Sequence, residues 1–109
     1  MPNSEELDVV FGALAHATRR EVLESLRAGP KTVGELAARH DMALPSFLQH
    51  IRLLEQCGLV TTEKRGRARV VSSRHEPMLQ LEAWLDDERR AWQQRLDQLD
   101  DFLIQGNAK

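Results

Sequence analysis

Apolar positions in the first part of the chain recur every three or four residues, which is the period of an amphipathic α-helix. One such stripe predicts a first helix at about residues 3–14. A second stripe follows Thr18 and Glu21, whose T-x-x-E spacing is that of a capping box and predicts that a second helix starts at Thr18. The sequence AGP at residues 28–30 ends this helix, because Gly and Pro do not continue helical hydrogen bonding.

The same period predicts two further helices joined by a tight turn. Thr32 and Glu35 form another T-x-x-E box ahead of a short helix. Pro45 suits the first turn of the next helix, at about residues 44–57, because that turn does not need its missing N–H. Gly58 suits the left-handed position that ends the helix. The apolar stripe of this helix consists of Leu44, Phe47, Ile51 and Leu54.

The period changes after this helix. The runs LVTTEK and RARVVSS favour β-structure on either side of Arg65 and Gly66, which predicts a β-hairpin at about residues 60–73. A long helix follows from Pro77, at about residues 77–105. Its large apolar side chains fall nearly on a heptad repeat: Leu81, Leu85, Trp92, Leu96, Leu99 and Leu103, with Trp84 and Phe102 beside them.

The predicted order is therefore helix, helix, short helix, helix, hairpin, long helix. A short helix, a tight turn and a second helix form a helix-turn-helix, and a hairpin directly after it is a wing. We therefore predict a mainly α fold with a small β-hairpin, a winged helix-turn-helix of order α-α-α-α-β-β-α. At 109 residues, the chain is expected to form a single domain over residues 1–109.

The distribution of charge says more than the net charge of −2. Residues 43–75 contain six Lys and Arg against two acids, a charge of +4. Residues 77–109 contain four Lys and Arg against seven acids, a charge of −3. A basic middle next to an acidic last helix predicts one surface for a polyanion and a separate surface with another role.

The polar face of the 44–57 helix is a candidate for base contacts. Ser46, Gln49 and His50 are predicted to project away from the apolar stripe, near the end of the helix that enters the DNA major groove in helix-turn-helix proteins. Gln can bond adenine bidentately, and Ser can reach several base edges. Arg52 lies further round, where a backbone phosphate is the expected contact. Taken alone, a polar outer face is more typical of a solvated helix, and the basic hairpin beside it shifts the interpretation to DNA contact.

The hairpin tip carries four cations around Gly66: Lys64, Arg65, Arg67 and Arg69. A tip needs the glycine but not the cations, and like charges across a ladder cost stability. Binding of these cations to DNA phosphates would offset that cost. The alternative role of the cations is to protect a sheet edge from aggregation. Clustering of the cations at the tip favours DNA. Lys31 and Thr32, at the start of the short helix, are a further candidate contact to the DNA backbone.

The last helix is too apolar to stand alone. Its stripe of Leu, Trp and Phe is longer than a small core can cover, which predicts a partner. The simplest partner is the same helix of a second copy, with the first helix beside it. A two-fold dimer presents two recognition helices to a pseudo-palindromic operator in double-stranded DNA. The predicted interface residues are Leu7, Phe11, Leu81, Trp84, Leu85, Trp92, Leu96, Leu99 and Leu103.

Three stretches, LAHATRREVLESL, TVGELAARHDMALPSFLQHIRLLEQCGLV and EKRGRARVV, resemble the ArsR/SmtB-type winged-helix repressors. The resemblance implies a homodimeric transcriptional repressor with its first and last helices at the interface and with DNA contacts from the recognition helix and wing. It does not carry over the metal and thiol sites of that family, because the short helix lacks cysteine and the last helix lacks histidine. No cofactor or metal is predicted. Leu48 is apolar where the family tends to be polar, and it either touches a thymine methyl or packs on an adjacent helix.

Other classes of function have weaker support. Cys57 cannot form an intrachain disulfide because it is the single cysteine, and we interpret it as a small hydrophobe. Ser46 and His50 are four residues apart but lack an orienting third group, so no enzyme is predicted. No apolar run reaches membrane-spanning length, and the first residues lack the layout of a signal peptide, which predicts a cytoplasmic protein.

The preferred function is a DNA-binding homodimeric repressor without an evident metal site. Two alternatives stay open: a metal- or thiol-responsive sensor with an unrecognised site, and a winged-helix module for protein interaction. The sequence identifies no inducer.

Overall fold

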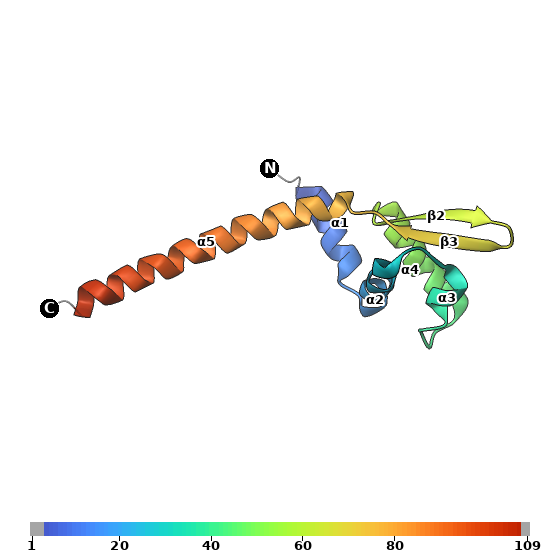
Figure 1. Ribbon diagram of the computed structural model, residues 1–109, viewed down its shortest axis with the longest axis horizontal. Coiled ribbons are helices and arrows are strands. Elements are labelled where there is room, and N and C mark those ends of the chain that lie inside the picture. The colour runs from blue at the N-terminus through green and yellow to red at the C-terminus, as the bar shows by residue number, and fades with distance from the viewer. Residues whose placement is uncertain (1–3, 108–109) are drawn as a thin grey trace.

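The computed structural model describes residues 4–107 and contains the predicted elements in the predicted order. Figure 1 shows the helices α1, α2, α3 and α4, then a β-hairpin, then the long helix α5. The winged helix-turn-helix prediction is confirmed. The bounds are Ser4–Leu14 for α1, Ala17–Ser25 for α2, Val33–Ala37 for α3, Leu44–Gln56 for α4, Val60–Arg65 for β2, Ala68–Ser73 for β3 and Glu76–Asn107 for α5.

Two short elements were not predicted. A single 3₁₀ turn, η1 (Leu26–Ala28), extends α2, and a two-residue strand, β1 (Lys31–Thr32), precedes α3. β1 pairs antiparallel with β3 through Lys31 opposite Val71, so the sheet has the order β1-β3-β2. This pairing fixes the start of α3 against the base of the wing.

The two predicted T-x-x-E boxes have different outcomes. The second box forms: the Glu35 amide donates to Thr32 Oγ1 at 3.1 Å, and the Thr32 amide donates to Glu35 Oε1 at 3.2 Å. The first box does not form, because α2 begins at Ala17 and His16 caps it by accepting from the Thr18 amide on Nδ1 at 3.2 Å. Thr18 is instead buried inside the helix. The start of α1 predicted at residue 3 lies outside the described residues.

The core lies between α2, α3, α4 and the hairpin. The prediction for α4 is confirmed for Phe47, Ile51 and Leu54, which are buried. It is wrong for Leu44, which is 54% exposed because it is the first residue of α4 and precedes the turns that the core covers. The buried cluster is Ala13, Val22, Leu26, Leu36, Phe47, Ile51, Leu54, Leu59, Val60 and Val71.

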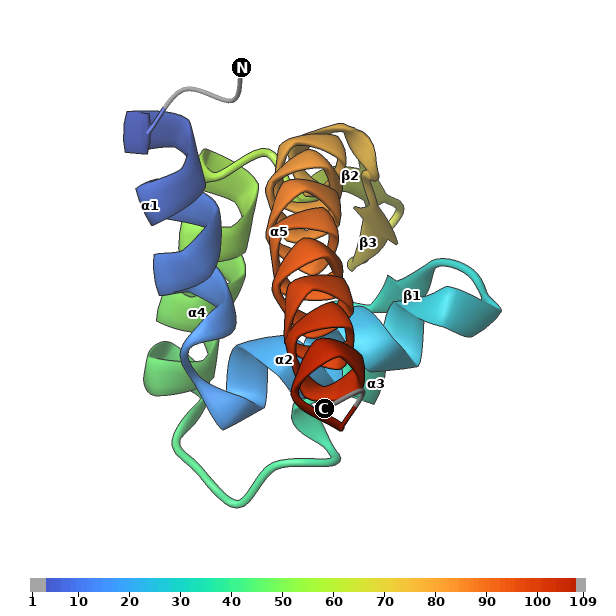
Figure 2. The ribbon, with the colours of Figure 1, turned by 90° about the vertical axis from the view of Figure 1, so that its left-hand side faces the viewer.

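Helix α5 leaves the body of the molecule. Figures 1 and 2 show that its first turns lie beside α1, whereas the rest extends away from the other described elements. The molecule is therefore elongated, with principal extents of 75 × 29 × 23 Å. Near the start of α5, the ring of Trp84 meets the ring of Phe11 on α1 edge-on at 5.5 Å. Within residues 4–107, no helix combines the length and apolarity that a membrane span requires.

Candidate nucleic-acid interface

The outer face of α4 is available to a ligand. Ser46 and Gln49 are exposed, on the side of the helix away from Phe47 and Ile51. Ala43 occupies the N-cap position and makes no side-chain cap, so the first amides of α4 are left to other acceptors. The predicted outward direction of Ser46 and Gln49 is confirmed, and their contact with bases stays a prediction.

His50 lies at the edge of this face, one turn after Ser46, and its ring is turned toward α2, which corrects its predicted outward direction. It is half-buried against α2, where its ring lies 4.3 Å from the ring of His16. Arg19 Nη1 donates to His50 Nδ1 at 3.1 Å. Burial lowers the pKa of the His50 imidazole, and the nearby His16 and Arg19 lower it further because they disfavour a second positive charge. His50 is therefore placed to hold α4 against α2.

Arg19 connects three elements, and no pattern in the sequence pointed to this role. Its Nε donates to the Ala13 carbonyl at 2.7 Å and its Nη2 donates to the Gly12 carbonyl at 3.0 Å. These bonds engage carbonyls in the last turn of α1, where a cation is favourable. With the bond to His50, Arg19 fixes α1, α2 and α4 relative to one another.

A second cluster fixes the turn between α3 and α4. Glu21 accepts from Ser25 Oγ at 2.6 Å and lies 2.6 Å from His40 Nε2, and Arg39 Nη1 is 3.4 Å away. Burial raises the pKa of the Glu21 carboxyl, but the hydrogen bonds from Ser25 and His40 outweigh it and hold the pKa below its ordinary value. The His40 ring also lies 5.3 Å from the ring of Phe47 in α4. The cluster thus anchors the turn that leads into α4.

The wing is joined to α4 by a chain of side chains. Arg69 Nη1 on β3 donates to Thr62 Oγ1 on β2 at 2.9 Å, and Thr62 donates to Glu55 Oε2 on α4 at 2.7 Å. Arg69 is therefore engaged within the hairpin. Beside this chain lies a hollow between α4 and the hairpin, lined by Val33, Leu48, Ile51, Arg52, Glu55, Gln56, Thr62 and Arg69. Arg52 is exposed at this hollow, as its predicted phosphate contact requires.

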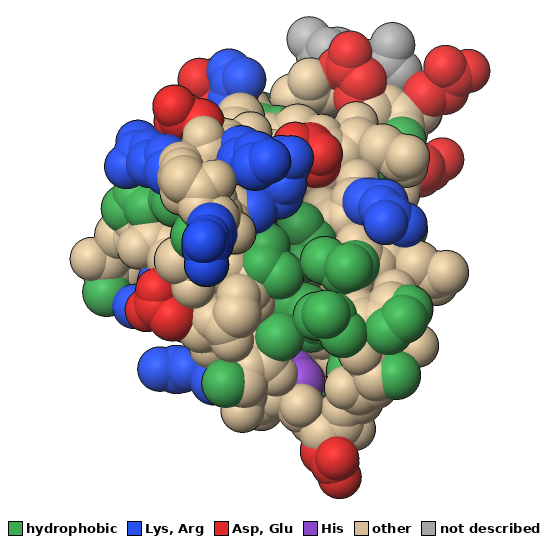
Figure 3. Space-filling view, turned by 90° about the vertical axis from the view of Figure 1, so that its right-hand side faces the viewer, with side chains coloured by type: hydrophobic (Ala, Val, Ile, Leu, Met, Phe, Trp, Pro, Cys, Tyr) green, Lys and Arg blue, Asp and Glu red, His purple; other side chains and the backbone are tan. Residues whose placement is uncertain are grey.

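The wing tip presents cations to solvent. Gly66 has a φ of +62°, the left-handed value that the first central position of a type II′ turn requires. Lys64 lies directly opposite Arg69 across the ladder, which places like charges side by side. Arg65 reaches Glu63 at 3.3 Å, and both side chains are largely exposed. Lys64 and Arg67 have neither a hydrogen bond nor an ion pair within the part of the chain that the structure describes. Figure 3 shows Lys and Arg side chains gathered around the wing, beside an apolar patch.

The candidate contact at the start of α3 is only partly available. Thr32 Oγ1 and the Thr32 amide are both engaged with Glu35, as described above. Lys31 is half-buried on β1, and its side chain makes neither a hydrogen bond nor an ion pair among residues 4–107. Lys31, rather than Thr32, is therefore the residue that can contact the DNA backbone.

The predicted dimer residues divide into three groups by their exposure. Leu7 is buried within one chain, at 8% exposure, so it packs α1 in the monomer and has little surface to offer a partner. Leu81 is half-buried at the start of α5. The remaining predicted interface residues are exposed: Phe11, Trp84, Leu85, Trp92, Leu96, Leu99 and Leu103. The distal half of α5 adds Phe102 and Ile104, at 70% and 67% exposure.

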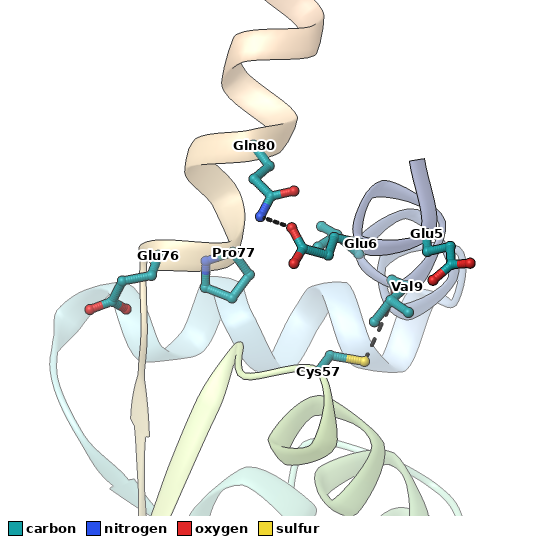
Figure 4. Close-up of a pocket in the computed structure, with 8 residues that line it drawn as sticks. Glu5, Glu6, Val9, Cys57, Glu76, Pro77 and Gln80 are labelled. Carbon is teal, nitrogen blue, oxygen red and sulfur yellow. Dashed lines mark hydrogen bonds between the residues drawn. The ribbon is translucent and has the colours of Figure 1, made fainter. Parts of the chain in front are cut away.

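A pocket opens between α1, the end of α4 and the start of α5 (Figure 4). Gln80 donates to Glu6 across it, and the Cys57 thiol faces the Val9 carbonyl at 3.9 Å. Burial raises the pKa of the Cys57 thiol, with Arg19 opposing, so the thiol form is favoured over thiolate. Among residues 4–107, no three His, Cys, Asp or Glu side chains are grouped as a metal site requires.

The comparisons with known proteins agree with this geometry. A family model described as a helix-turn-helix domain matches residues 14–63. The chain is 32% identical over 87 residues to YuzN of Bacillus subtilis, an uncharacterized HTH-type transcriptional regulator, a match that covers 72% of this chain and 95% of YuzN. It is 31% identical over 58 residues to the transcriptional repressor SdpR of the same organism, covering 53% of this chain and 64% of SdpR.

Among solved structures, the crystal structure of an ArsR family transcriptional regulator matches with a TM-score of 0.79 at 47% identity. That match covers 84% of this chain and 94% of the other. The family-model match includes the helix-turn-helix, and the structural match extends over most of both chains. The chain therefore belongs to the ArsR family of winged helix-turn-helix transcriptional regulators.

Proposed function

We propose that the protein is a homodimeric repressor that binds a pseudo-palindromic operator, with α4 in the major groove and the wing on the adjoining backbone. The observation that carries the proposal is the fixed pairing of two surfaces. The exposed polar face of α4 is joined through Glu55, Thr62 and Arg69 to a wing whose cations Lys64 and Arg67 have no partner among the described residues. A duplex offers both a groove with base edges and a row of phosphates.

Within this proposal, Ser46 and Gln49 contact bases, and Arg52, Lys31, Lys64, Arg65 and Arg67 contact phosphates. His50 acts through position rather than by contact, because Arg19 and His16 occupy its ring. Phosphate contacts fix the protein on the duplex, and base contacts select the sequence.

The second part of the proposal is a dimer through α5. Six large apolar residues of the last 16 in α5 are at least 51% exposed, and a stripe of this kind is covered in a stable soluble protein. They are Trp92, Leu96, Leu99, Phe102, Leu103 and Ile104. The proposed partner is α5 of a second copy, beside Phe11 and Trp84. Two copies related by a two-fold axis give two recognition helices, which matches an inverted repeat.

Repression follows from occupancy, because a dimer on a promoter excludes polymerase. The relative SdpR is named a transcriptional repressor, which supports a repressor role for this chain. The proposed location is the cytoplasm, where a repressor of this kind meets its promoter. A winged-helix module for protein interaction is disfavoured by Lys64 and Arg67, which are unpaired among the described residues, because desolvating them against a protein surface costs free energy.

The test measures affinity for selected duplexes at several salt concentrations. Arg65→Ala with Arg67→Ala should weaken binding to all sequences alike and should reduce the slope of log affinity against log salt by about 0.9 for each phosphate that the variant no longer neutralises. Gln49→Ala should relax preference at one base position by about 1–3 kcal/mol. The matched control is Arg89→Ala with Arg90→Ala, which removes two exposed cations from α5.

The control should leave the salt slope unchanged while the dimer persists. If the wing variant and Gln49→Ala both bind like the unmodified protein, the assigned roles are wrong. If the unmodified protein binds no duplex even in dilute salt, the proposed function is wrong.

A further inference from the structure

We infer that Leu44 and Leu48 bind the C5-methyl groups of thymine, so that the protein reads part of its operator through apolar contacts. This inference rests on the proposed function, because only a recognition helix in the major groove brings these two side chains to bases. It concerns base preference, whereas the proposed function concerns DNA binding itself.

Leu44 is placed where a recognition helix meets base edges. It is the first residue of α4, and its side chain is 54% exposed. In helix-turn-helix proteins the N-terminal residues of this helix contact the bases. Neither Leu44 nor Ala43 provides a side-chain cap for the helix, so this end of α4 carries a large apolar group in a position where a polar cap is ordinarily favoured.

Leu48 continues the same apolar surface. It is one turn after Leu44, so the two side chains lie on one flank of α4. Leu48 is half-buried and lines the hollow between α4 and the hairpin, together with Val33 of α3. The sequence left two roles open for Leu48, contact with a thymine methyl and packing on an adjacent helix, and both apply in part. Neighbouring elements cover one side of Leu48, and its other side is open toward the hollow.

The surroundings of this surface identify its occupant. Arg52 and Arg69 line the same hollow together with Glu55, whose carboxylate accepts from Thr62, so cations outnumber acids there. The remaining wing cations lie nearby (Figure 3). An apolar patch bordered by cations complements a ligand that combines apolar groups with dense negative charge. The major groove of DNA is such a ligand, because the thymine methyl lies on its floor and phosphates line its edges.

The spacing sets the length of sequence that can be read. Four residues of α-helix rise about 6 Å, which is close to two base-pair steps of about 3.4 Å. Leu44 and Leu48 therefore reach methyl groups within a stretch of about three base pairs in each half-site. Thymines further from this stretch lie beyond their reach.

The experiment removes single methyl groups from the DNA. A preferred duplex is selected from random sequences, and each thymine of one half-site is then replaced in turn by deoxyuridine, which lacks only the methyl. Loss of one buried methyl is expected to weaken binding about four-fold, by conversion of the transfer free energy of one carbon. Sensitive thymines should fall within one short stretch, and Leu44→Ala and Leu48→Ala should abolish their sensitivity.

The matched control is Leu79→Ala, which removes a leucine on α5 with 53% exposure. This variant should bind the thymine duplex more tightly than the uracil duplex by the same factor as the unmodified protein. Leu44→Ala is the decisive variant because its side chain is exposed and its removal leaves the core intact. If the selected duplex binds with steep salt dependence but tolerates every uracil, the inference is overturned and DNA binding stands. Methyl dependence that persists in both leucine variants also overturns it. If the unmodified protein binds no duplex, the proposed function is wrong.

Discussion

Glu21 offers the sharpest test of what positions the recognition helix. Its carboxylate holds Ser25 and His40, each at 2.6 Å, and His40 is in the turn that leads into α4. Glu21→Ala removes both bonds and leaves the His40 side chain, only 11% exposed, without this acceptor. Hydrogen bonds to a charged group contribute about 1.5–3 kcal/mol each, and the 31% exposure of Glu21 lets water replace part of this, so the expected loss is about 2–4 kcal/mol.

Thermal unfolding at fixed protein concentration measures this loss. For a domain of this size, 2–4 kcal/mol corresponds to a fall in Tm of about 10 °C or more. Glu24→Ala is the control, because Glu24 is exposed on the same helix and should change stability by less than about 0.5 kcal/mol. Equal Tm values for the two variants would refute the view that Glu21 anchors this turn.

The pH dependence gives an independent check on Glu21. Because its folded-state pKa lies below the ordinary value of 4.5, the folded protein binds fewer protons than the unfolded chain between those two values. The stability from this carboxylate is therefore complete above about pH 4.5 and is lost as the pH falls through the folded-state pKa. Glu21→Gln should flatten the stability curve in that acidic range and leave a smaller defect at neutral pH than Glu21→Ala.

Three other contacts carry predictions of their own. Because the pKa of His50 is lowered below 6.5, stability should decline as the pH falls below about 6.5, and His50→Gln should reduce that decline in thermal unfolding curves. Thr62→Val breaks the chain from Arg69 to α4, so the free energy of unfolding should fall by about 1–2 kcal/mol and hydrogen exchange in the wing should accelerate. Trp92→Glu places a charge in the proposed dimer seam and should give monomers in sedimentation, whereas Gln94→Glu on the same helix should not.

Long periodic elements could be predicted from the sequence, but their short connections could not. The bounds of α4 and the hairpin differ from their predicted bounds by no more than one residue. The apolar stripe, Pro45 and Gly58 mark the extent of α4, and Gly66 marks the turn of the hairpin. β1 has only two residues, and its pairing with β3 depends on the fold rather than on a local pattern. The failed box at Thr18 shows the same limit, because core packing draws Thr18 inside the helix and leaves His16 as the cap.

The candidate site shows this limit residue by residue. Ser46 and Gln49 are near the centre of the polar face of α4, so helical spacing alone placed them correctly. His50 is at the edge of that face, where the direction of a side chain depends on the neighbouring helix and, in this protein, on Arg19. The pairing of Glu21 with His40 joins residues 19 positions apart, a separation that carries no sequence signal.

The free-standing part of α5 has a consequence for how the cell handles this chain. Most helical stability in proteins comes from tertiary packing, and the distal turns of α5 have none against the other described elements of one subunit. In the proposed dimer a second copy covers these turns, so a newly synthesised single copy exposes an apolar, frayed helix to chaperones and proteases. If the proposed dimer forms, proteolysis should act mainly on single copies, and the lifetime of the protein should rise with its own concentration.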